Sequence, residues 1–193
     1  MKKIWTMLLC LLVLSGCGKA PQSAFLQEQY NAVTRAELTA EISAHLPDEI
    51  RQYQVTCDYD ADGGADIVIT APAELAGIRA TVSGDDLTLT YDDLALSAGT
   101  VENISPVSCL PWMLRAAASG YVLEEGRETI GDRDCLRAAF DTSGPDNEKV
   151  MCTIWFDRET LYPVYSEFSC DGQLRLSVKV ISFTAETATP AEP

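Results

Sequence analysis

The architecture of this chain is best predicted from the segment Ser105-Pro-Val-Ser-Cys-Leu-Pro-Trp-Met-Leu-Arg-Ala-Ala-Ala-Ser-Gly120. Ser105 is a suitable N-cap, Pro106 suits a first helical position, and Gly120 suits the end of a helix. Pro111 is expected to divide the segment into a short turn and a helix that starts just after it, near Trp112. Apolar side chains cover almost the whole circumference of this helix, and such a helix must be buried on all sides. The segment therefore predicts a central helix that the rest of the chain surrounds.

Runs of alternating apolar and polar residues, which are typical of half-buried strands, lie on both sides of this segment. Before it they cover 36–46, 53–59, 67–69, 78–82, 87–91 and 94–96, and after it 121–129, 133–141, 149–157, 162–170 and 173–184. Short turns connect them, which indicates an antiparallel meander. A further stretch, 23–33, has apolar residues at helical spacing. The sequence thus predicts an α+β, mostly β, fold: a single curved antiparallel sheet of about 11 strands forms an incomplete barrel around the central helix, with an N-terminal helix beside it.

The first residues have the pattern of an export signal. Lys2 and Lys3 precede an apolar run, Ile4 to Leu14, that is too short to span a membrane. The run ends in Leu14-Ser-Gly-Cys17, which looks like the lipobox at which bacterial lipoproteins are cleaved and lipidated. The alternative is an ordinary signal peptide with a chance cysteine. We expect a signal peptide over 1–16, a lipidated tether over 17–22, a folded domain over 23–184 and a disordered tail over 185–193.

The charge balance excludes some partners. The chain has 29 acidic and 14 basic residues, a net charge of −15. Nucleic-acid binding depends on Lys and Arg contacts with phosphates, so we expect no nucleic-acid partner. An anionic bilayer should repel this surface, so membrane attachment would depend on a palmitate-type lipid anchor on Cys17.

The cysteines do not form a recognisable metal motif. Five of them, Cys57, Cys109, Cys135, Cys152 and Cys170, follow the lipobox without a C-x-x-C pair, and His45 is the single histidine. Outside the cytoplasm an odd count leaves at least one thiol free, and the sequence does not assign the pairing. Cys57 and Cys152 fall in the apolar phase of their strands, where a cysteine usually acts as a small hydrophobic residue.

The run Asp58-x-Asp60-x-Asp62-Gly63 matches the first half of an EF-hand loop, with Asp66 at the ninth position. The match then fails, because Ala65 replaces a branched residue and Ile69 replaces the bidentate Glu at position twelve. We interpret the run as an acidic hairpin turn, with adventitious calcium as the alternative. His45 lies in the water-facing phase of its strand, and no catalytic motif is present. We therefore expect no enzyme, metal or cofactor.

Several short segments resemble the lipoprotein-carrier superfamily, the LolA/LolB-like fold, and in particular its lipid-anchored branch. The matching segments are Ile69 to Ile78, Leu89-Thr-Tyr-Asp92, Ser105-Pro106, Trp155-Phe-Asp157 with Pro163, and Asp171-Gly172. The similarity covers about residues 25–184. It implies a protein that binds acyl chains of lipoproteins or lipids, or an envelope scaffold or regulator. Periplasmic carriers of this superfamily are not lipidated, so Cys17 indicates an anchored acceptor or accessory lipoprotein.

These patterns lead to two hypotheses. In the first, an extracytoplasmic, membrane-anchored, non-enzymatic lipoprotein binds a hydrophobic or acyl moiety in the hollow of the half-barrel. The candidate lining residues lie on the central helix: Leu110, Trp112, Met113, Leu114 and Ala117. In the second, these side chains fill the hollow themselves, and the protein is an interaction or regulatory module that binds an envelope protein.

Overall fold

The computed structural model describes residues 22–84, 86–92, 94–100, 104–143 and 149–188, without the side chains of 98–100. The expected signal peptide, Cys17 and nearly all of the tether lie outside the described residues. Within them no helix is long and apolar enough to cross a membrane.

The structure contains two helices and eleven strands in these ranges. They are α2 (Gln22–Asn31), β1 (Val33–His45), β2 (Ile50–Asp60), β3 (Gly64–Ala71), β4 (Arg79–Ser83), β5 (Asp86–Tyr91), β6 (Leu94–Thr100), α3 (Cys109–Ser119), β7 (Tyr121–Ile130), β8 (Arg133–Asp141), β9 (Val150–Asp157), β10 (Pro163–Cys170) and β11 (Gln173–Thr187).

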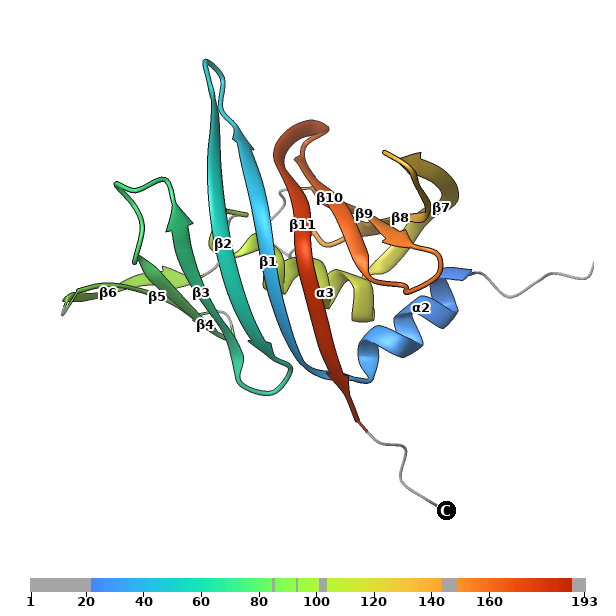
Figure 1. Ribbon diagram of the computed structural model, residues 1–193, viewed down its shortest axis with the longest axis horizontal. Helices are drawn as coiled ribbons and strands as arrows, with labels where there is room; N and C mark the ends of the chain where they lie inside the picture. Colours follow the sequence, from blue (N-terminus) through green and yellow to red (C-terminus); the bar gives the residue numbers. More distant parts are fainter. Residues whose placement is uncertain (1–21, 85, 93, 101–103, 144–148, 189–193) are drawn as a thin grey trace, which may run out of the picture.

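All eleven strands form one antiparallel sheet in the order β6-β5-β4-β3-β2-β1-β11-β10-β9-β8-β7. Neighbouring strands in the sheet are consecutive in the chain except at the centre, where β1 pairs with β11, with Ile42 opposite Val178. The two end strands, β6 and β7, do not pair within the described ranges, so the sheet stays open. Figure 1 shows α3 behind β1 and β11, on the concave side of the curved sheet. The predicted fold, an incomplete barrel around a central helix with an N-terminal helix, is confirmed.

Strand β1 shows why alternation decides the local structure. Its Ala and Glu residues favour helix, yet Ala36, Leu38, Ala40, Ile42 and Ala44 are buried and the residues between them are not. A period of two places one apolar face against the core, and that burial outweighs a weak local preference for helix. The opposite face, which is convex and polar, meets solvent.

Helix α3 starts earlier than the sequence indicated. It begins at Cys109 instead of near Trp112, so Pro111 lies in its first turn, where a missing N–H removes no intrahelical hydrogen bond. The preceding turn is held by Ser108, whose hydroxyl accepts the N–H of Ser105 at 3.0 Å. The helix ends at Ser119 and is capped by Gly120, where a Cβ atom would lie 2.6 Å from the carbonyl oxygen of Ala116.

The expectation that α3 is buried on all sides is partly wrong. Cys109, Leu110, Pro111, Met113, Leu114, Ala116 and Ala117 are buried. Trp112, Arg115 and Ala118, at a spacing of three residues, are only half-buried. One face of the helix is therefore partly open to solvent.

The last strand is longer than expected. β11 runs to Thr187, which pairs with Val33 of β1, so residues 185–187 belong to the sheet and not to the tail expected from Ala185. Their sequence, Ala-Glu-Thr, has no alternation that predicts a strand, and they are ordered by pairing with residues of β1 about 150 positions earlier in the chain. At this same end of β1, α2 contacts the core through Tyr30, whose ring meets Phe156 edge-on at 5.3 Å.

Candidate ligand-binding surface

The structure places the five predicted lining residues on α3, but it does not place them all at an open hollow. Leu110, Met113, Leu114 and Ala117 are each at most 3% exposed and belong to the packed core. Trp112 is the one member that is half-buried. The chain itself therefore covers four of the five side chains.

An apolar surface that the sequence did not reveal lies on the concave face of β5 and β6. In β4 the buried residues Ala80 and Val82 face the core. Leu89 lies opposite Ala80, and Leu87 lies opposite Val82. On the next strand, Leu96 pairs with Leu89 and Leu94 with Tyr91. Because directly paired residues share a face of a sheet, all of these side chains continue the core-facing surface. We define the concave patch as Leu87, Leu89, Tyr91, Leu94 and Leu96.

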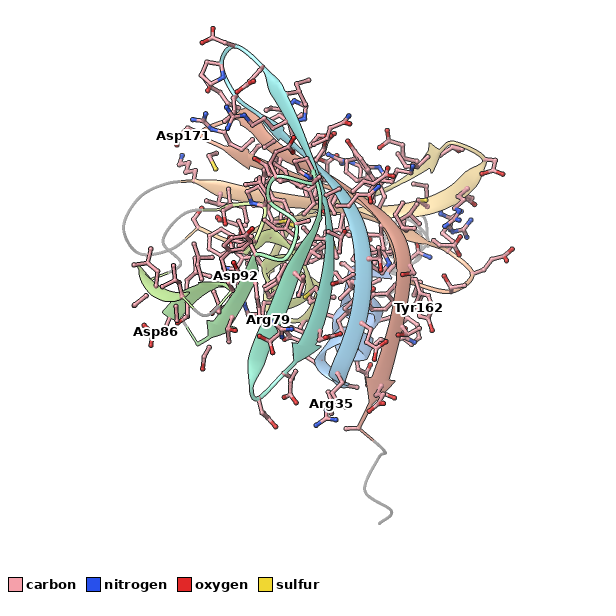
Figure 2. The ribbon with its side chains drawn as sticks, turned by 60° about the vertical axis from the view of Figure 1, so that its left-hand side comes forward. Arg35, Arg79, Asp86, Asp92, Tyr162 and Asp171 are labelled. Carbon is pink, nitrogen blue, oxygen red and sulfur yellow. The ribbon has the colours of Figure 1, made fainter. Side chains whose placement is uncertain are left out.

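The outer part of the concave patch is exposed to solvent. Leu94 is 78% exposed, Leu96 67% and Tyr91 49%. The neighbouring loop after β3 borders the patch, since a Cβ atom at Gly77 would lie 4.0 Å from Cε2 of Tyr91. Asp86, the first residue of β5, and Asp92, which follows its last residue, are labelled in Figure 2.

The patch is exposed because the helices cover the other half of the sheet. Helix α3 packs mainly against α2, β8 and β9, and α2 packs against β7. Figure 1 shows β5 and β6 extending away from both helices. A contiguous apolar surface on an open edge is typical of a binding site. The alternation of Leu87, Leu89 and Tyr91 predicted the strand, but it carries no information on where a distant helix stops.

Cys57 and Cys152 are small residues of the core, as their positions in the apolar phase of their strands predicted. Burial raises the pKa of Cys57 to about 12, and it raises the pKa values of Cys109 and Cys152 as well. These thiols are protonated at neutral pH and are poor nucleophiles. Cys57, Cys109, Cys135 and Cys152 are present as thiols, and Cys170 is also buried.

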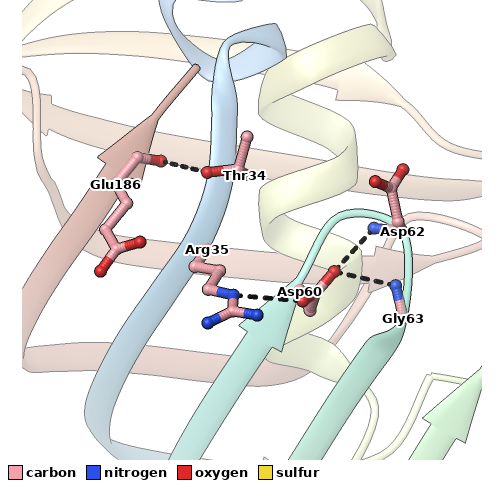
Figure 3. A network of polar contacts seen from close by, with 6 residues as sticks. All are labelled: Thr34, Arg35, Asp60, Asp62, Gly63 and Glu186. Atoms are coloured by element: carbon pink, nitrogen blue, oxygen red, sulfur yellow. Dashed lines mark hydrogen bonds and ion pairs between the residues drawn. The ribbon is translucent and has the colours of Figure 1, made fainter. Parts of the chain in front are cut away.

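The acidic run forms the expected hairpin turn between β2 and β3 (Figure 3). The Asp60 carboxylate accepts the backbone N–H groups of Asp62 and Gly63, both at 3.0 Å. Its other oxygen pairs with Nε of Arg35 at 3.3 Å. The two backbone donors hold the pKa of Asp60 below its usual value. In the described ranges no three His, Cys, Asp or Glu side chains converge in a way that could hold a metal ion.

His45 has a partner that the sequence did not indicate. Its Nε2 atom lies 3.1 Å from the hydroxyl of Ser177 on β11, on the water-facing side of the sheet. The pairing of β1 with β11 creates this contact across 132 residues of sequence.

No protein-family model and no curated protein sequence matches this chain. Solved structures do match. An uncharacterised conserved protein from Thermus thermophilus has a TM-score of 0.53 at 10% identity, over 88% of this chain and 90% of that one. A LolA superfamily protein from Nitrosomonas europaea has a TM-score of 0.47 at 13% identity, over 88% and 96%. The lipoprotein LppX from Mycobacterium tuberculosis has a TM-score of 0.47 at 14% identity, over 83% and 93%.

At these identities the likeness is one of fold alone. The architecture agrees with what the sequence resemblance implied, element by element: one open antiparallel sheet, a helix in its curl and a helix before the first strand. The chain shares its fold with the Thermus thermophilus protein, and this architecture is the one that the resemblance to the LolA/LolB-like superfamily implied.

Proposed function

We propose that this protein is a lipid-anchored, extracytoplasmic, non-enzymatic binding protein that holds a hydrophobic or acyl moiety against the concave patch. The observation that carries the proposal is the exposure of Leu94 and Leu96 on the face of the sheet that is elsewhere core. Burying two such side chains under an acyl chain would be favourable by about 1.5–3 kcal/mol each. The resemblance to a superfamily that binds acyl chains supports the same function.

The proposed location follows from the first residues of the sequence. The basic pair, the apolar run and the Leu-Ser-Gly-Cys order support export, cleavage after Gly16 and lipidation of Cys17. Two acyl chains on one residue give stable attachment, which a single chain does not. Growth with an alkyne-labelled palmitate should label the native protein and leave Cys17→Ser unlabelled. Equal labelling of both forms would contradict the proposed anchor.

A photo-reactive amino acid placed at position 94 or 96 tests ligand binding in the cell. Irradiation should attach a lipid to the full-length protein at these positions, which mass spectrometry of the released peptides would identify. The matched control is position 181 on β11, where Ile181 is also exposed, at 52%, but lies outside the concave patch. Lipid adducts as frequent at 181 as at 94 would show that the patch has no specific ligand.

A second function has its own support. The near-complete burial of Leu110, Met113, Leu114 and Ala117 agrees with a hollow that the chain fills itself. In that case the concave patch would contact an envelope protein. The same irradiation experiment separates the two: a protein adduct at 94 and 96 with no lipid adduct would replace the first proposal by the second.

A further inference from the structure

A groove of about 580 Å³ lies on the convex face of the sheet, opposite to α3. It extends across β10, β11, β1 and β2 to the start of the loop after β3, and its size is within the range of small-molecule sites, about 300–1,000 Å³. Its location is separate from the concave patch, because the polar side chains that line it lie on the other face of the sheet.

Strand register assembles the groove from two cross-strand rows. In the first row Tyr165 pairs with Lys179, Lys179 with Glu41 and Glu41 with Gln54. In the second row Ser177 pairs with Ser43 and Ser43 with Gln52. The side chains of both rows lie between the buried apolar positions of β1 and β11, so they point to the convex side.

Tyr165 forms a fixed aromatic wall at one side of the groove. Its ring packs against Trp155 with centroids 5.4 Å apart. Its hydroxyl donates to Glu167 at 3.3 Å and also interacts with the hydroxyl of Ser177. Trp155 is in turn held by a hydrogen bond from Nε1 to Glu128 at 2.9 Å and by Arg137, 5.8 Å from its ring centroid. The ring is therefore positioned before any ligand arrives.

The opposite side of the groove offers free polar groups and little net charge. The side-chain amides of Gln52 and Gln54 are exposed and make no hydrogen bond to the described part of the chain. Lys179 and Glu41 neutralise each other through an ion pair of 3.1 Å. Each amide supplies donors and an acceptor side by side.

We propose that this convex groove binds a neutral oligosaccharide. A sugar ring has an apolar face of polarised C–H groups, which suits the negative face of an aromatic ring, and a rim of hydroxyls, which suits amides and a Lys–Glu pair. The polar lining does not suit an acyl chain, and the net charge of −15 disfavours anionic ligands such as nucleotides. The proposal does not depend on the function of the concave patch.

Calorimetric titration of the full-length protein tests this proposal. The protein is kept in a polyoxyethylene detergent, because a sugar-headed detergent would compete. The probes are three neutral trisaccharides: one of N-acetylglucosamine, one of α-linked glucose and one of β-linked glucose. At least one should bind saturably with a dissociation constant of about 1 mM or tighter. No saturable binding by any of the three would overturn the proposal.

Variants show whether binding occurs in this groove. Gln54→Ala should weaken binding by about tenfold, since it removes both a donor and an acceptor. Tyr165→Phe should retain most of the affinity, because the ring and not the hydroxyl forms the wall. The matched control is Thr56→Ala, which alters the same strand and face as Gln54 but lies outside the groove. Binding that Gln54→Ala leaves unchanged, in a variant with native circular dichroism, would also overturn the proposal.

Discussion

Among single residues, Ser166 has a buried polar group that destabilises the fold. It lies on β10 between Ile154 and Val178, fully buried, and its hydroxyl has no hydrogen-bond partner in the described structure. A buried hydroxyl without a partner costs about 1–3 kcal/mol. Ser166→Ala should therefore raise the free energy of unfolding by about 1 kcal/mol in urea denaturation.

Ser108 provides the matched control, because it is equally buried but its hydroxyl is bonded to the N–H and the hydroxyl of Ser105. Ser108→Ala should lower the free energy of unfolding by about 1 kcal/mol, since it leaves the Ser105 N–H without its acceptor. If both substitutions changed the free energy of unfolding in the same direction, this assignment of the hydrogen bonds would be contradicted.

Asp157 links one residue to the pH dependence of stability. Its carboxylate accepts the backbone N–H groups of Thr160 and Glu159, and these bonds hold its pKa below the usual value. A lowered folded-state pKa contributes stability that is present above about pH 4 and is lost as the pH falls through the folded-state pKa. Asp157→Asn should be less stable than the native protein at pH 7, and the difference should narrow in denaturation curves below pH 4. A difference that stays constant with pH would contradict this account.

Among the elements, β1, β2 and β3 carry a row of like charges. Glu37 lies directly opposite Asp58, and Asp58 lies opposite Asp66. Directly opposed like charges are destabilising by some tenths of a kcal/mol. Asp58→Asn should raise the free energy of unfolding by about 0.5 kcal/mol at low salt, and the gain should shrink at about 1 M salt, where charges are screened. A gain independent of salt would mean that charge repulsion is not its cause.

Replacing leucine by alanine should have different effects on stability in helix α3 and in strand β6. Leu110 is fully buried on α3, so Leu110→Ala should cost about 2–5 kcal/mol of stability. Leu94 is largely exposed on β6, so Leu94→Ala should change stability by less than about 0.5 kcal/mol while weakening lipid capture. Equal losses of stability for the two variants would mean that the concave patch is covered in the folded protein.

For the molecule as a whole, local patterns predicted most of the fold. Alternation located the strands, and the apolar segment 105–120 correctly indicated a helix inside the sheet. What local patterns could not predict depends on contacts between distant segments. The β1–β11 pairing orders residues 185–187, and the partner of His45 comes from β11.

The candidate site was predicted less well for the same reason. The candidate lining residues from the sequence lie on α3, where Leu110 and Met113 are packed in the core. The sequence predicted a strand at Leu94 and Leu96 but not their exposure. Whether an inward-facing leucine is covered depends on where α3 ends relative to β6, which is a property of the whole molecule. No local pattern reports that distance.

Native mass spectrometry can detect an acyl ligand bound to the open half of this sheet, as proposed above. The protein would be exported from Gly18 onward behind an ordinary secretory signal and purified without detergent. A folded chain carrying about one lipid per molecule, with occupancy reduced in Leu94→Lys, is the predicted result. A folded chain whose mass is that of the polypeptide alone would contradict the proposal.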